Sequence, residues 1–153
     1  MSVRRYPSAC DVCGERAVRL SSDPLPMEYR EGTFAVEGFE YEHCEACGES
    51  FIDAVDIDRL QRAGVKSARA GLGRLSSTQI REMRLALGIT QAVLEGQLGV
   101  SAGTVGRWER GEELQTRIAD NFLRVLGAHP ELVAETMGAV ARESRGPYRP
   151  RSR

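Results

Sequence analysis

The twenty residues Gln91–Arg110, QAVLEGQLGVSAGTVGRWER, determine the fold predicted for the C-terminal half of the chain. Their apolar positions are Leu94, Leu98, Val100, Val105 and Trp108, with Gly99 between them. This spacing predicts two short helices that bury one face each against the other across a tight turn. The second helix then projects outward, in a position to enter the major groove of DNA.

Further helices are predicted on both sides of this pair. The expected bounds of the five helices of this half are 78–87, 91–98, 102–110, 115–126 and 130–141. Ser76-Ser77, Thr90 and Ser101 are expected to cap the first three, and Pro130 suits the first turn of the last. Gly88, Gly99 and Gly111 are expected to end the first three. The tail 142–153 carries five arginines and two prolines and is predicted to be disordered.

All four cysteines lie in two Cys-x-x-Cys pairs, Cys10–Cys13 and Cys44–Cys47, each followed by glycine. Two residues between ligands let one turn present both sulfurs to one ion, and the glycine can close that turn. We therefore predict one structural Zn²⁺ per chain, held by Cys10, Cys13, Cys44 and Cys47. His43 is expected to be a bystander, because four thiolates already fill the site.

Between the two pairs, aromatic and β-branched residues alternate with polar ones and are separated by glycine turns. The segments 27–30, 33–36 and 39–43 are predicted to form a small antiparallel meander. From Asp53 the pattern becomes helical and runs into a glycine- and arginine-containing connector that ends near Arg74. A metal would stabilise the thin core of such a module.

The sequence thus predicts an α+β protein of two domains, a small zinc-bound antiparallel β module followed by an all-α five-helix domain. We expect the zinc-binding module at residues 1–60, a helix end and linker at 61–76, the helix-turn-helix DNA-binding domain at 77–141 and the basic tail at 142–153. No apolar signal core or membrane-length apolar segment is apparent, so a cytoplasmic location is expected.

The net charge of −1 conceals a strong asymmetry along the chain. Residues 1–60 hold 6 Lys/Arg against 13 Asp/Glu, a net −7, whereas residues 61–153 hold 15 against 9, a net +6. Such a division is typical of two modules with oppositely charged partners, although two solvated surfaces would give the same numbers. The basic half suits DNA.

The segment Thr90–Gly111, with its Trp-Glu-x-Gly ending, resembles a helix-turn-helix of the Cro/cI (Xre) type. On this resemblance Gln91 is expected to donate to a phosphate. Five residues are expected to face the groove: Ser101, Ala102, Gly103, Thr104 and Arg107. Arg107 is long enough for a bidentate contact to guanine, and Arg110 and Arg74 are candidate phosphate contacts.

Two features of this segment bear on its architecture. Arg84 and Glu109 resemble the structural ion pair of the Xre family. Glu95 stands where that family usually has a small residue that lets the two helices approach. We therefore expect either that the helix tilts or that Glu95 bends outward.

The whole arrangement, from Cys10 to about Glu135, is similar to the MqsA-type antitoxins, including the segment Leu123–Leu132 that follows their last core helix. The resemblance implies a type II antitoxin whose zinc domain binds an RNA-cleaving toxin. It also implies a helical domain that dimerises, binds operator DNA and represses its own operon. Gly103 stands where the family prototype has a base-contacting asparagine, so the same operator is not expected.

Two other functions compete with this interpretation. One is a stand-alone Xre-type regulator whose zinc module binds a ligand or another protein. The other is an oxidoreductase built on Cys-x-x-Cys, which would need one such pair near a βαβ pattern rather than two. A disulfide framework would need a secreted chain. We expect a protein that is not an enzyme.

Overall fold

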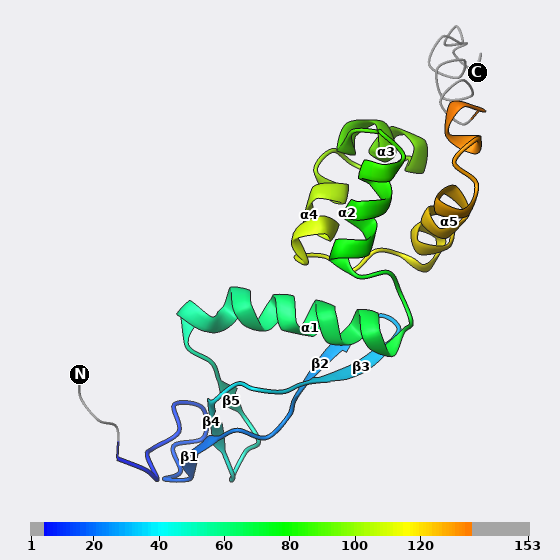
Figure 1. Ribbon diagram of the computed structural model, residues 1–153. Helices are drawn as coiled ribbons and strands as arrows, with labels where there is room; N and C mark the ends of the chain where they lie inside the picture. Colours follow the sequence, from blue (N-terminus) through cyan, green and yellow to red (C-terminus); the bar gives the residue numbers. More distant parts are fainter. Residues whose placement is uncertain (1–4, 136–153) are drawn as a thin grey trace, which may run out of the picture. The chain divides into compact units, whose positions relative to one another are not determined.

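The computed structural model describes residues 5–135. The chain forms two compact units, divided between Gly71 and Leu72 (Figure 1). An antiparallel β module with four clustered cysteines precedes the helices of the second unit, which confirms the predicted fold class. No helix in the described part of the chain has the length and hydropathy needed to cross a membrane. The predicted tail 142–153, and the predicted last helix beyond residue 135, lie outside the described residues.

The first unit contains two small antiparallel sheets. Strands β2 (Leu25–Tyr29) and β3 (Gly32–Val36) form a hairpin with a two-residue loop, since Tyr29 pairs with Gly32. Strand β4 (Tyr41–Cys44) lies between β1 (Val18–Ser21) and β5 (Ser50–Phe51). All three segments expected as strands are found, but the predicted meander was wrong, because β4 pairs with β1 and β5 instead of β3.

The pairing of β4 follows from the position of the cysteine turns. Cys44 lies opposite Val18 in the β1–β4 ladder, and Ser8 forms an isolated bridge to Val18 on its other side. Through Val18, these two pairings place the segment before Cys10 close to Cys44, so that the two cysteine turns meet. Pairing of β4 with β3, its neighbour in sequence, would not bring Cys44 to β1.

A 3₁₀ turn (Ala54–Asp56) leads into α1 (Ile57–Gly71), which packs against β3. Two glycines, seven residues apart on one face of the helix, permit this close packing. A Cβ at Gly64 would lie 2.7 Å from the Tyr29 hydroxyl oxygen, and one at Gly71 would lie 2.6 Å from the Phe34 ring. Helix α1 runs across residue 60, and its whole length belongs to the first unit.

The second unit consists of α2 (Ser77–Ala86), α3 (Gln91–Leu98), α4 (Thr104–Arg110) and α5 (Arg117–Ala128). The helical residues 132–135 end the described part, so the last helix begins two residues after the predicted Pro130. These helices enclose one core: Ile80, Leu94, Val105, Trp108, Ala119, Leu123, Leu126 and Val133.

The predicted helix ends are largely found. Ser76 caps α2 in a capping box with Gln79, and Thr90 accepts from the Val93 N–H at the start of α3. Gly99 and Gly111 end α3 and α4 in the left-handed conformation.

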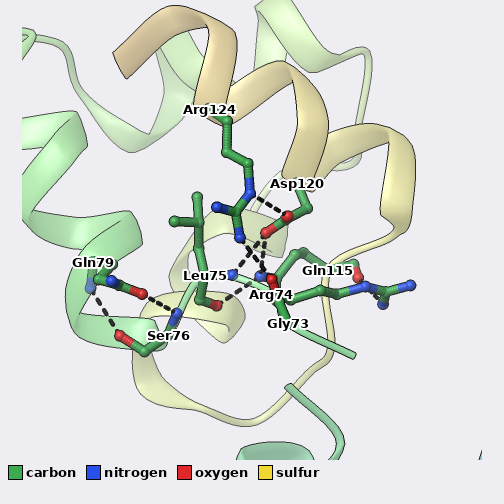
Figure 2. Close-up of polar contacts among 8 residues, drawn as sticks. All are labelled: Gly73, Arg74, Leu75, Ser76, Gln79, Gln115, Asp120 and Arg124. Atoms are coloured by element: carbon green, nitrogen blue, oxygen red, sulfur yellow. Dashed lines mark hydrogen bonds and ion pairs between the residues drawn. The ribbon is translucent and has the colours of Figure 1, made fainter. Parts of the chain in front are cut away.

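A buried polar network joins the start of α2 to α5 (Figure 2). One carboxylate oxygen of Asp120 accepts from the Leu75 N–H at 2.8 Å, and the other accepts from Arg124 at 2.8 Å. Gln115 donates to the Leu75 carbonyl at 2.7 Å, and Arg124 donates to the Gly73 carbonyl at 2.7 Å. Asp120 is 4% exposed, so these contacts hold residues 73–75 against α5 with little competition from water.

Asp120→Asn is expected to lower the free energy of unfolding of the second unit by about 1–3 kcal/mol at neutral pH. Burial raises the pKa of Asp120, but hydrogen bonds from Arg124, Leu75 and Gln115 outweigh it and lower that pKa. The carboxylate therefore stabilises the fold above its unfolded pKa of about 3.9, and this contribution is lost as the pH falls through the lower, folded pKa.

Urea titration followed by the fluorescence of Trp108, the one tryptophan of the chain, measures this unit selectively. The gap between wild type and Asp120→Asn should narrow as the pH falls below about 4. Glu82→Gln, an exposed change on α2, serves as the control. A gap that stays constant down to the acid transition would contradict the assignment.

Candidate metal centre and candidate nucleic-acid interface

The four cysteines converge in the first unit. Their sulfurs all lie within 4.8 Å of one another, with Cys10–Cys47 at 3.8 Å and Cys13–Cys44 at 3.7 Å. A disulfide would need about 2.05 Å, and all four cysteines are free. In a tetrahedral site with Zn–S distances of about 2.3 Å, neighbouring sulfurs lie about 3.8 Å apart. The cluster can therefore hold a metal ion, and its geometry fits tetrahedral zinc.

The two Cys-x-x-Cys turns have the same backbone geometry. The Gly14 N–H donates to the Cys10 carbonyl at 2.9 Å, and the Gly48 N–H donates to the Cys44 carbonyl at 2.8 Å. Both glycines have φ near +80°, at 79° and 81°, where a residue with a Cβ is strained. Each turn thus presents two sulfurs in a fixed arrangement.

The local electrostatics favour thiolate at one of the buried ligands. The backbone N–H groups of Cys47 and Ala46 outweigh the effect of burial and lower the pKa of the Cys44 thiol to about 7. Thiolate is the form that binds metal. His43 lies outside the cluster, with Nδ1 3.2 Å from the Ser50 hydroxyl oxygen.

The second candidate site is the surface of α3 and α4. Behind it, Arg84 of α2 forms a bidentate ion pair with Glu109 of α4, with one contact at 3.1 Å. Both side chains are largely buried, and the hydrogen bonds from Arg84 and Gln91 overcome the effect of burial and lower the pKa of Glu109. This pair anchors α4 to α2.

Gln91 also belongs to this anchor. Its side-chain amide donates to Glu109 at 2.8 Å, and its amide oxygen lies over Gly106, where an added Cβ would approach it to 3.2 Å. The amide nitrogen has a second N–H, so the bond to Glu109 orients the Gln91 side chain and leaves one donor for another acceptor. Gly106 leaves room for the amide between α3 and α4.

The start of α4 differs from the sequence prediction. The N-cap is Gly103, with φ 81°, and not Ser101, and no side chain of its own caps the helix. Glu95 of α3 supplies the missing acceptor, since its carboxylate accepts from the Val105 N–H at 3.0 Å. Glu95 is 7% exposed. The expectation that Glu95 bends outward is therefore wrong, because Glu95 points inward and caps α4.

Arg107 extends from α4 between two oxygen acceptors. Its Nε donates to Glu113 at 2.6 Å, and its Nη2 donates to the Thr104 hydroxyl at 2.9 Å. Thr104 is only 7% exposed, so it offers little surface to a base and instead orients the guanidinium. A Cβ at Gly103 would lie 3.4 Å from Arg107 Nη1, so a larger residue there would crowd the same group.

The remaining predicted contacts surround Arg107. Ser101, Ala102 and Gly103 are exposed ahead of α4. Arg110 forms a two-pronged pair with Glu112, with both contacts at 2.9 Å. Arg74 donates to the Gln115 carbonyl in the network of Figure 2, which gives it a structural role.

The sequence analysis did not predict the hydrogen bonds that three acidic residues form with α4: those of Glu95, Glu112 and Glu113. Glu112 and Glu113 follow the helix-ending Gly111 directly. A left-handed glycine folds the chain back over the last helical turn. The position of Glu112 and Glu113 directly after Gly111 therefore could have predicted their contacts with Arg107 and Arg110. The position of Glu95 offered no such signal, because its partner Val105 lies ten residues away across a turn.

Comparison with known proteins covers both sites. A family model described as the antitoxin component of bacterial toxin–antitoxin system, MqsA, matches residues 8–137. Antitoxin MqsA of Escherichia coli (strain K12) is 27% identical over 128 residues, which cover 82% of this chain and 97% of that protein. The matched region contains the four cysteines and the whole helix-turn-helix.

Proposed function

The chain belongs to the MqsA family of antitoxins, and on this premise we propose that it neutralises a toxin through its first unit and represses its own operon through its second. The toxin is proposed to be a ribonuclease, and the setting is the cytoplasm. One observation carries the proposal: a four-cysteine centre in an acidic unit and a helix-turn-helix in a basic unit occur in one chain.

The metal of the four-cysteine centre is proposed to be one structural Zn²⁺ per chain. Four thiolates fill a tetrahedral coordination sphere and leave no position for a substrate. The residues that would hold it are Cys10, Cys13, Cys44 and Cys47. Its contribution is to fold the first unit, and no catalytic step is part of the proposed function.

The acidic first unit supports a basic protein partner. A ribonuclease binds a polyanion and so carries basic surface, which attracts a unit that holds 13 Asp/Glu against 9 Lys/Arg, a net −4 over residues 1–71. This unit also contains an open cleft of about 760 Å³, whose lining includes Glu40, Asp53, Asp56, Tyr41 and Phe51. Carboxylates beside aromatic rings suit arginine and lysine side chains.

Co-expression with the adjacent open reading frame tests the toxin half of the proposal. The neighbour's product should arrest growth when expressed alone, and this chain should restore growth and co-purify with it. A stand-alone regulator would show neither rescue nor co-purification, and that result would reject the antitoxin function.

The DNA half rests on the proposed contact residues Gln91, Ser101, Ala102, Gly103, Thr104, Arg107 and Arg110. Arg107→Ala is expected to weaken operator binding by roughly 1–3 kcal/mol, the value of a bidentate contact to guanine. Binding to random DNA should weaken far less. Fluorescence anisotropy at one stated salt concentration measures both, with Arg62→Ala in the first unit as the matched loss of charge. Equal losses on both duplexes would make Arg107 a phosphate contact.

A homodimer formed through the second unit is also proposed, since helix-turn-helix proteins usually bind two half-sites. Ile118 and Val125, 83% and 47% exposed, lie on one face of α5. Ile118→Asp is expected to convert a dimer to a monomer by light scattering at micromolar concentration. Val55→Asp is the matched control, since Val55 is 82% exposed but lies in the first unit. A wild-type monomer would reject the dimer.

A further inference from the structure

Two carboxylates lie against the two arginines of α4, Arg107 and Arg110. Glu113 accepts from Arg107 Nε at 2.6 Å, and Glu112 accepts from Arg110 Nε and Nη2 at 2.9 Å each. The loop that carries the carboxylates is itself fixed, because the Glu112 N–H donates to the Arg107 carbonyl at 2.9 Å and Gly111 is left-handed. Both pairs thus follow from the way α4 ends.

These contacts occupy the Nε–Nη2 edge of each guanidinium, one of the edges that DNA can use. A bidentate contact to guanine uses two N–H groups of one guanidinium. In this structure Arg107 Nε is bound to Glu113 and Nη2 is bound to Thr104. A base edge that uses the Nε–Nη2 edge of Arg107 must displace the Glu113 carboxylate, and one that uses Nη1 binds a guanidinium whose charge Glu113 already partly neutralises. Glu112 acts on Arg110 in the same way towards a phosphate.

The exchange is feasible because the pairs are open to water. The side chains of Arg107 and Glu113 are 41% and 44% exposed, and those of Arg110 and Glu112 are 57% and 31% exposed. Ion pairs with this exposure contribute little to stability. They remain close enough to compete with any other anion that approaches the same guanidinium.

We propose that Glu112 and Glu113 determine DNA specificity by acting as internal competitors for Arg110 and Arg107. This inference rests on the proposed function. An operator with guanine at the right position replaces the Glu113 contact with two directed hydrogen bonds. Random DNA offers Arg107 and Arg110 only phosphates that are not in position for directed hydrogen bonds, and these compete less well with Glu113 and Glu112. The two carboxylates therefore lower the affinity for random DNA more than the affinity for the operator.

The test compares Glu112→Gln, Glu113→Gln and the double variant with wild type. The probes are the duplex upstream of the protein's own gene and a duplex of equal length with the same bases shuffled. The double variant is expected to bind the shuffled duplex about two- to thirtyfold more tightly, the range for two exposed pairs. Operator affinity should change by less, so the specificity ratio should fall.

Glu82→Gln on α2 is the matched control for each single variant, since it also removes one exposed negative charge from the second unit. The proposal is overturned if Glu112→Gln and Glu113→Gln each bind the shuffled duplex as tightly as the control does, or if affinity for both duplexes rises by the same factor in the double variant. A wild-type protein that bound neither duplex would overturn the proposed function and this inference with it.

A second measurement, on the protein without DNA, tests the Arg107–Glu113 contact itself, independently of its effect on DNA affinity. The Arg107 Nε–H proton should give a slowly exchanging NMR signal in wild type, and this signal should exchange faster in Glu113→Gln. An equal exchange rate in the two proteins would overturn the proposed competition, whatever the DNA measurements show.

Discussion

Cys44→Ser is expected to abolish metal binding and to unfold the first unit while the second stays folded. Cys44 is completely buried and forms a small cluster with Cys10 and Val18. It also ends β4, the strand that joins β1 to β5. A module with so thin a core depends on the metal for folding, and structural Zn²⁺ sites of this kind contribute about 10–16 kcal/mol.

Three measurements on the full chain check this expectation. The zinc content measured by metal analysis should fall from about one Zn²⁺ per chain to a small fraction of that. The β-sheet signal of circular dichroism should fall, while the fluorescence of Trp108 should not change, because that side chain lies in the core of the second unit. A strong chelator should reproduce the same pattern in wild type.

His43→Gln is the control for Cys44→Ser. His43 is adjacent to Cys44 in sequence, but it lies outside the sulfur cluster. The His43→Gln variant should keep its metal and its β-sheet signal. Retention of both metal and β structure by Cys44→Ser would show that the cluster does not build the fold.

The features that were predicted correctly depend on residues that are close together in the sequence. The turns at Cys10 and Cys44 need two ligands and a glycine within five residues, so neighbouring residues alone specify them. The same holds for Thr90, whose hydroxyl accepts from a backbone N–H at the start of α3, and for Gly99 and Gly111, whose left-handed conformation ends α3 and α4. The helix-turn-helix follows from such signals plus apolar spacing.

The features predicted wrongly depend on contacts between distant segments. Strand β5 has two residues, Ser50 and Phe51, too few to show a period, and it exists because β4 offers an edge. The pairing of β4 with β1 joins segments that are distant in sequence and brings the two cysteine turns together, which no strand propensity encodes. Ser101 is a good capping residue in isolation, but the helix starts after Gly103 because Glu95 supplies the cap from another helix.

Glu95→Ala is expected to lower the free energy of unfolding of the second unit by about 1–3 kcal/mol. The substitution removes the cap of α4 and leaves the Val105 N–H without its acceptor. Val105 is completely buried, so water cannot replace the lost oxygen, and a buried unsatisfied donor costs about 1–3 kcal/mol. Loss of a helix cap usually costs about 1 kcal/mol, and burial of the donor places this one in the upper part of that range.

Glu95→Gln separates the cap from the charge. Glutamine keeps an oxygen that can accept from Val105, so this variant should lose well under half of the stability that Glu95→Ala loses. Urea denaturation followed by Trp108 fluorescence gives both values, and Glu82→Ala, an exposed glutamate on α2, is the control.

Hydrogen exchange at Val105 locates the effect of Glu95 within the unit. Because Glu95 binds one end of α4 and the Arg84–Glu109 pair holds its other end, losing Glu95 should open the first turn of α4 before the rest of the helix. The Val105 amide should therefore exchange much faster in Glu95→Ala, while amides near Glu109 should change only with global stability. Uniform acceleration along α4, or stability equal to that of Glu82→Ala, would contradict a capping role for Glu95.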